Sequence, residues 1–126
     1  MPHEAPAVRM MVFLSEDDRA EHRSLPEVLL ERAREEGMAG ATLWRGVEGF
    51  GATGRLRGTR FPDAGLGLPL VLEVVDAPER IEELLAVVHD LAPGSFVTTE
   101  DLTVVGGPAG TLPLDDAVPR PRRRRG

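Results

Sequence analysis

The residues best suited to hold an anion lie between positions 49 and 60, where glycine and arginine are concentrated. The segment contains Gly49, Gly51, Gly54, Gly58, Arg55, Arg57 and Arg60. Guanidinium groups pair with phosphates and carboxylates through several N–H donors, and glycine lets the backbone approach a ligand closely. In an extended chain Arg55 and Arg57 share one side, so the pattern predicts a loop that meets an anionic ligand or a partner. The alternatives are a plain exposed connection, or arginines that pair with acids of a neighbouring subunit.

A second group of candidate ligands is the acidic segment 15–23, SEDDRAEHR. It holds Glu16, Asp17, Asp18, Glu21 and His22. Carboxylates and imidazole are common ligands of divalent metals. Their spacing fixes no coordination geometry, so we expect solvated loop acids and no metal.

Few residue types offer acid–base or nucleophilic chemistry. The chain has three histidines, no cysteine and no lysine. Without lysine the glycines do not form a Walker A loop, and without cysteine there is no disulfide or thiolate metal site. His89 has no apparent partner for proton transfer. We therefore predict a protein that is not an enzyme and that carries no cofactor.

Charge is divided unevenly along the chain. Residues 1–105 hold 10 arginines and 19 acids, a net charge of −9, whereas residues 106–126 hold five arginines and two acids, a net charge of +3. An acidic body repels phosphate backbones, so we expect the folded domain to bind no nucleic acid. The Pro/Gly/Arg tail 106–126 is predicted to be disordered. It either holds nucleic acid or anionic lipid, folds back on the acidic body, or has no role.

No apolar run approaches the roughly 20 residues that span a bilayer. The start of the chain, MPHEAPAV, has no apolar signal region. These two observations predict a cytoplasmic location.

Hydrophobic periodicity predicts the elements that position these residues. Apolar, β-rich stretches predict strands over 8–14, 39–50, 68–76 and 95–105, and apolar stripes at helical spacing predict helices over 25–36 and 78–91. Residues 1–7 are expected to be a flexible N-terminus, 8–105 one domain, and 51–67 a long loop.

Both predicted helices are preceded by residues with capping-box spacing. Ser24 is followed by Glu27, and Asp76 by Glu79. Such pairs satisfy free amides at a helix start through their side chains. Gly37 provides a natural stop for the first helix.

The order βαββαβ predicts an α+β fold, a ferredoxin-like sandwich. Right-handed crossovers place two helices on one face of a four-stranded antiparallel sheet. In the first strand Met10 and Val12 alternate with Met11 and Phe13, so both faces are apolar. Two helices cover one face only, and an uncovered apolar face usually mediates association. We expect a homo-oligomer with the sheets inward.

The stretch GMAGATLWRGVEGFGA, followed by LPLVLEVVD and then PERIEELL, resembles the DUF190 family of the PII-like signalling superfamily. The resemblance covers about residues 8–105. It implies a ferredoxin-like fold, a homotrimer, and sensing rather than catalysis. PII-like trimers bind adenine nucleotides or related molecules in clefts between subunits. Their loop between the second and third strands then reports to a partner, often a membrane transporter or channel.

The resemblance also assigns candidate ligand-binding residues. Gly49-Phe50-Gly51 matches the GFG that ends the second strand of PII proteins, where backbone amides meet phosphates. Carried over, Gly51 and Ala52 supply the amides. Arg55 stands close to the position of a loop-base arginine in those proteins.

Further candidates complete this predicted site. Glu16 and Asp18 are expected to line the cleft, and Arg57 is expected to bind ligand beside Arg55. In PII proteins a glycine-rich, lysine-containing turn follows the second helix, whereas LAPGSF offers Gly94 and no basic residue.

We therefore predict a regulator that binds a small anionic effector. The effector is either an adenine nucleotide (ATP, ADP or AMP) or another anion. Arg55, Arg57 and Arg60 would contact a partner such as a membrane transporter. The alternative is an oligomeric interaction module with no small-molecule ligand.

Overall fold

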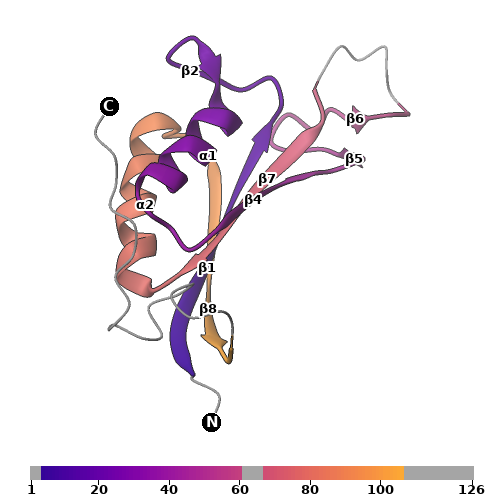
Figure 1. The fold of residues 1–126 in the computed structure, drawn as a ribbon. Coiled ribbons are helices and arrows are strands. Elements are labelled where there is room, and N and C mark those ends of the chain that lie inside the picture. The colour runs from indigo at the N-terminus through magenta and orange to yellow at the C-terminus, as the bar shows by residue number, and fades with distance from the viewer. Residues whose placement is uncertain (1–3, 61–66, 107–126) are drawn as a thin grey trace.

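A computed structural model describes residues 4–60 and 67–106 of the chain. Four strands form one antiparallel sheet in the order β4–β7–β1–β8. They are β1 (Ala5–Ser15), β4 (Ala41–Arg45), β7 (Pro69–Asp76) and β8 (Phe96–Val104). Helices α1 (Leu25–Glu35) and α2 (Pro78–Leu91) both pack on one face of this sheet (Figure 1). The predicted α+β ferredoxin-like sandwich is confirmed.

The core lies between the sheet and the two helices. Its fully buried members include Met10, Val12, Leu29, Leu72, Val74, Leu84 and Val88. Side chains on a strand alternate between faces, so the even-numbered residues of β1 and β7 reach the helices together. Of the two alternating sets in the first strand, the one with Met10 and Val12 is therefore the buried one.

The opposite sheet face carries the second apolar set. Phe13 is 42% exposed, Trp44 56% and Phe96 69%. Phe13 and Phe96 pair across β1 and β8, with ring centroids 5.6 Å apart in an edge-to-face arrangement. Arg9 bridges the same face through ion pairs to Glu73 and Glu100. No helix of the described residues covers this face.

The strand predicted over 39–50 is broken. β4 ends at Arg45, and a separate β5 (Glu48–Gly49) pairs with β6 (Arg57–Gly58). Figure 1 shows this small ladder projecting away from the main sheet. The ladder of β4 with β7 ends here, because the amide of Gly46 donates to the carbonyl of Pro69 (2.8 Å) but proline has no amide to donate in return. A Cβ at Gly46 would lie 2.9 Å from the proline ring. The predicted 51–67 loop thus contains a strand, and its residues 61–66 lie outside the described part of the chain.

The acidic segment expected to be a loop contains a tight hairpin. Two-residue strands β2 (Arg19–Ala20) and β3 (Arg23–Ser24) are joined by Glu21 and His22. Both turn residues have positive φ, 53° and 64°. Two consecutive positive φ values are typical of the hairpin turns that match strand twist. The sequence lacks the Asn-Gly or Asp-Gly pair that usually signals such a turn.

Neither predicted capping box forms. Ser24 is the N-cap of α1 but makes no side-chain cap bond, and the N-cap of α2 is Ala77. The buried carboxylate of Asp76 instead accepts from the amides of Ala39 (3.0 Å) and Ala77 (2.7 Å). It therefore ties the α1–β4 connection to the start of α2. Gly37, with a φ of 76°, follows the end of α1 as predicted.

The structure describes most of the predicted flexible N-terminus but almost none of the predicted C-terminal tail. β1 begins at Ala5, so part of the N-terminus that was expected to be flexible pairs with β8. The predicted tail lies outside the described residues from position 107 onward. Within the described part, no helix has the length and apolar character needed to cross a bilayer.

Candidate functional site

A cavity of about 590 Å³ lies at the end of the sheet where β1 terminates. This volume falls within the range of roughly 300–1,000 Å³ that small-molecule sites occupy. Its walls come from the end of β1, the acidic turn that follows, the β5–β6 region, the start of β7 and the α2–β8 connection. The fold brings these five segments together although they span residues 13–96 of the sequence.

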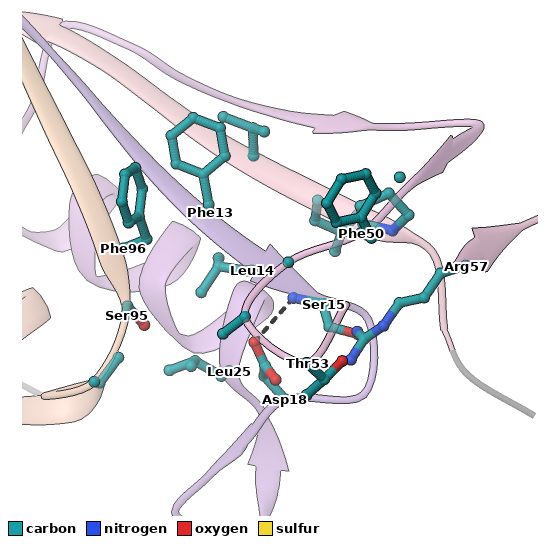
Figure 2. A pocket seen from close by; sticks show the side chains of 18 of the residues that line it. Phe13, Leu14, Ser15, Asp18, Leu25, Phe50, Thr53, Arg57, Ser95 and Phe96 are labelled. Atoms are coloured by element: carbon teal, nitrogen blue, oxygen red, sulfur yellow. Dashed lines mark hydrogen bonds between the residues drawn. The ribbon is translucent and has the colours of Figure 1, made fainter. Parts of the chain in front are cut away.

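One wall is polar and is fixed by short local hydrogen bonds. Asp18 accepts from the amide of Ser15 through Oδ2 (2.9 Å), as the dashed line in Figure 2 marks. The amide of Asp18 donates in turn to the carbonyl of Ser15 (3.1 Å). Both residues line the cavity together with the exposed Arg19. The turn therefore presents the Asp18 carboxylate at the rim, while the guanidinium of Arg19 donates to the carbonyl of His22 (2.9 Å).

Arg57 lies on the opposite side of the same cavity. It is half-buried on β6, and its side chain points toward the wall that contains Ser15 and Asp18 (Figure 2). Among residues 4–60 and 67–106, no carboxylate lies within ion-pair distance of its guanidinium. A partly buried cation without a counter-ion attracts an anionic ligand.

Gly58 determines where Arg57 points. Its φ of 152° is one that side chains rarely adopt, and a Cβ there would lie 2.7 Å from Cγ of Glu48. Only glycine lets β6 approach β5 this closely, so the ladder that carries Arg57 depends on this position.

Aromatic rings form the apolar part of the cavity. Phe13, Phe50 and Phe96 all line it, and Phe50 is 70% exposed at the rim (Figure 2). Exposed aromatic rings provide flat apolar surface on which a planar ligand ring can pack. The cavity thus combines a flat apolar surface with the guanidinium of Arg57 and the carboxylate of Asp18.

Most of the predicted site residues line this cavity. They are Asp18, Gly49, Phe50, Gly51, Ala52, Arg57 and Gly94. Their role in ligand binding is still a prediction, but the fold places them around one space. Gly94 comes from the α2–β8 connection.

Three other predicted residues lie elsewhere. Arg55 is exposed and does not line the cavity, because the chain turns at Gly51–Gly54 and becomes extended only at Arg57. Arg60 forms a bidentate pair with Glu48, with 2.6 Å between Nη2 and Oε2. Glu16 lies outside the cavity, and its carboxylate pairs with Arg45 (2.9 Å).

The Arg60–Glu48 pair ties β5 to the residues after β6. Hydrogen bonding from the Arg60 guanidinium, assisted by its charge, lowers the pKa of Glu48, although partial desolvation opposes the shift. The same contact raises the pKa of Arg60. One alternative paired the loop arginines with acids of a neighbouring subunit, but the acid that pairs with Arg60 lies in the same chain.

Several cavity residues were missed from the sequence. The sequence places Phe13 on one of the two apolar faces of the first strand, Phe96 only within the last strand, and Arg19 in a loop, whereas all three line the cavity. A usable signal was available for the two rings, since the ferredoxin-like topology pairs the first and last strands and places the end of one beside the start of the other. In the described ranges, no group of three or more His, Asp or Glu side chains is arranged to hold a metal ion.

Comparison with known proteins gives a consistent result. The family model DUF190, described as "Uncharacterized ACR, COG1993", matches residues 7–104. A UPF0166 protein of Aquifex aeolicus is 34% identical over 96 residues, which is 76% of this chain and 90% of that protein.

Two solved structures share the fold. One is CPII from Thiomonas intermedia K12, a nitrogen regulatory PII-like protein bound to ADP, AMP and bicarbonate. It has a TM-score of 0.55 and 20% identity, and the match covers 83% of this chain and 98% of that one. The other is a putative PII-like signaling protein from Thermus thermophilus, with a TM-score of 0.55, 18% identity and coverage of 81% and 91%. At these identities the likeness shows a shared PII-like fold and confirms the predicted one.

Proposed function

Because the chain belongs to the DUF190 family and has a PII-like fold, we propose that it is a regulatory protein that binds a small anionic effector in the cavity at the end of β1. The observation that carries this proposal is the placement of Arg57. It faces a cavity of about 590 Å³ without a carboxylate partner among the described residues, beside the glycine-rich backbone with which it pairs at Gly49.

Adenine nucleotides are the first class of effector to test. CPII, which shares the fold, is bound to ADP and AMP in its structure. In this chain a purine ring would pack on Phe50 or Phe96, and phosphates would meet Arg57, Arg19 and the amides of the 49–53 segment. The carboxylate of Asp18 disfavours a large negative charge nearby, so the cavity suits ADP or AMP better than ATP.

The same proposal includes a partner protein whose affinity for this chain depends on whether the effector is bound. Arg55 is exposed on the described part of the 51–67 segment and is free of the cavity, so it is available to contact an acidic surface. The partner proposed is a membrane transporter or channel, met from the cytoplasmic side. Effector binding would shift the population of conformations in this segment and so change partner affinity.

We also propose that the protein acts as a homotrimer with its open sheet faces inward. Phe13, Trp44 and Phe96 expose large apolar side chains on one face, and burying such a patch favours association. The cavity is open on one side, where a neighbouring subunit would complete it. A second candidate function rests on this face alone, namely an oligomeric interaction module that binds no small ligand.

Isothermal titration calorimetry of the full chain with ATP, ADP, AMP and cyclic AMP tests the proposal. Light scattering on the same sample gives the oligomeric state. Saturable binding in the micromolar range, strongest for ADP or AMP, is expected. A folded oligomer that gives no heat with any of the four would favour the interaction module.

A further inference from the structure

Residues 15–18, at the end of β1, form a turn that contacts two different parts of the molecule. Ser15 and Asp18 line the cavity, whereas Glu16 and Asp17 contact the end of the β6–β7 connection, at Gly67 and Leu68. We infer that this turn, residues 15–18, couples the cavity to the root of that connection, with Glu16 and Asp17 as positioning residues. The inference rests on the proposed function, since it concerns the regulation of the same cavity.

The contacts on the side of the β6–β7 connection are short and specific. Asp17 accepts from the amide of Gly67 through Oδ2 (2.6 Å), and Glu16 accepts from the amide of Leu68 through Oε1 (2.7 Å). The amide of Glu16 donates back to the carbonyl of Leu68 (3.0 Å). Hydrogen bonds to carboxylates are roughly twice as strong as neutral ones. Two consecutive acids therefore hold two consecutive amides just before β7 begins.

The packing at Gly67 is an independent sign of close contact. A Cβ at this position would lie 2.7 Å from Cβ of Glu16 and 2.8 Å from Oδ1 of Asp17. Neither atom is the far end of a long flexible side chain. Any residue other than glycine would therefore push the turn away from the β6–β7 connection.

Glu16 reaches a third segment as well. Its Oε2 pairs with Nη2 of Arg45 (2.9 Å) at the end of β4, while its Oε1 holds Leu68. One carboxylate thus joins the two ends of the stretch that leaves the main sheet after β4 and returns at β7. That stretch contains Arg57 and the 49–53 backbone of the cavity.

The turn is stiff enough to transmit a displacement. The Ser15 amide donates to Asp18, the Asp17 amide donates to Oγ of Ser15 (3.3 Å), and the Asp18 amide donates to the Ser15 carbonyl (3.1 Å). An effector that moves Ser15 or Asp18 must therefore move Glu16 and Asp17 with them. By linkage, a change at Gly67 must alter effector affinity in return.

The first test measures ADP affinity of the full chain by calorimetry. Asp17→Asn and Glu16→Gln keep the side-chain size but remove the charge that holds Gly67, Leu68 and Arg45. Each is expected to weaken ADP binding by roughly threefold to tenfold, the scale of mutations that modulate coupling. Glu31→Gln is the matched control, since Glu31 lies on α1 and this change removes the same charge from an exposed ion pair, here with Arg23 of β3. It should leave ADP affinity unchanged.

Hydrogen exchange distinguishes coupling between the cavity and Gly67–Leu68 from contacts that only stabilise this connection. In the native chain ADP should increase protection of the Gly67 and Leu68 amides. In the Asp17→Asn variant this ADP-dependent increase should disappear. If these contacts only stabilise the connection, the Gly67 and Leu68 amides of the variant should be less protected both with and without ADP, and the affinity for ADP should be unchanged.

The second test needs no ligand. Gly67→Ala should shift the amide NMR resonances of Ser15, Asp18 and Arg19, which line the cavity. Gly40→Ala adds the same methyl group where no atom lies within 4 Å, and should leave them in place. If Gly67→Ala does not fold, the shifts in Asp17→Asn serve the same purpose.

The two tests separate the two claims. ADP binding with unchanged affinity in Asp17→Asn and Glu16→Gln, and with cavity amides unmoved, would overturn the inference but not the proposed effector site. Absence of ADP binding to the native chain would count against the proposed nucleotide, and the NMR shifts then decide the coupling alone.

Discussion

Replacing Arg57 by alanine is the sharpest test of the effector site, because Arg55 provides a control two residues away. Both changes remove one positive charge from the same segment. Only Arg57 lines the cavity, half-buried and without an ion pair to any described carboxylate. Arg55 is exposed and lies outside the cavity. A site defined by geometry should therefore distinguish them, whereas a diffuse basic loop should not.

The size of the effect follows from the burial of Arg57. Hydrogen bonds to charged groups contribute about 1.5–3 kcal/mol. A half-buried guanidinium at an open cavity falls at the lower end, and about 1.5 kcal/mol corresponds to roughly tenfold in Kd. The exposed charge of Arg55 interacts with the ligand only at long range, where water and salt screen it, so its loss should change Kd by less than about twofold.

The assay is calorimetric titration of ADP and AMP into the native chain and the two variants at the same ionic strength. Circular dichroism and light scattering confirm that fold and assembly are retained. Equal losses in both variants would refute the cavity assignment and support a diffuse electrostatic attraction. No loss in the Arg57 variant, with binding intact, would place the phosphates elsewhere.

Three further predictions concern stability and assembly. Leu72→Ala removes a fully buried core side chain and should lower the free energy of unfolding by about 2–5 kcal/mol in urea denaturation. Val105→Ala, which is 60% exposed, should change it by less than about 0.5 kcal/mol, and equal effects would contradict the assigned core. Since pairing with Arg60 lowers the pKa of Glu48 from its ordinary value of 4.5, its contribution is present above that value and is lost as pH falls through the lowered pKa. The protection factors of the β5–β6 amides, which are the intrinsic exchange rates divided by the observed rates at the same pH, should therefore fall at acidic pH in the native chain. In Glu48→Gln they should be low at every pH, and protection factors independent of pH in the native chain would contradict the pairing. Met11→Asp places a charge in the middle of the open face and should reduce the mass by light scattering from trimer to monomer while circular dichroism is retained; an unchanged mass would exclude this face as the interface.

Much of the fold was predictable because it depends on local patterns. The apolar stripe after Asp76 predicts a helix over 78–91, and α2 spans Pro78–Leu91. Alternation in the first strand predicts that Met10 and Val12 share one face and Met11 and Phe13 the other, and Met10 and Val12 are fully buried whereas Phe13 is 42% exposed. Side-chain direction in a strand or helix follows from its period alone, so no knowledge of tertiary contacts is needed.

The errors arose where a distant contact decided the local structure. The strand predicted over 39–50 breaks at Gly46, because Pro69 of β7 accepts its amide but has no amide to continue the ladder. The capping box at Asp76 does not form, because its carboxylate accepts a hydrogen bond from the amide of Ala39 instead. Residue propensities contain no information about either partner.

For the candidate site, the sequence by itself determined which groups are available: arginines, glycines and acids at known positions. It also determined a fold that places the end of the first strand beside the start of the last. It did not determine which arginine would face the cavity. Arg55 and Arg57 are equivalent by residue type and spacing, and only the pairing of β6 with β5 turns Arg57 inward. Likewise, only the tertiary structure turned Glu16 away from the cavity, because the amide of Leu68 and the guanidinium of Arg45 together bind its carboxylate. A side chain takes its direction from the partners that satisfy it, and these partners are distant in the chain.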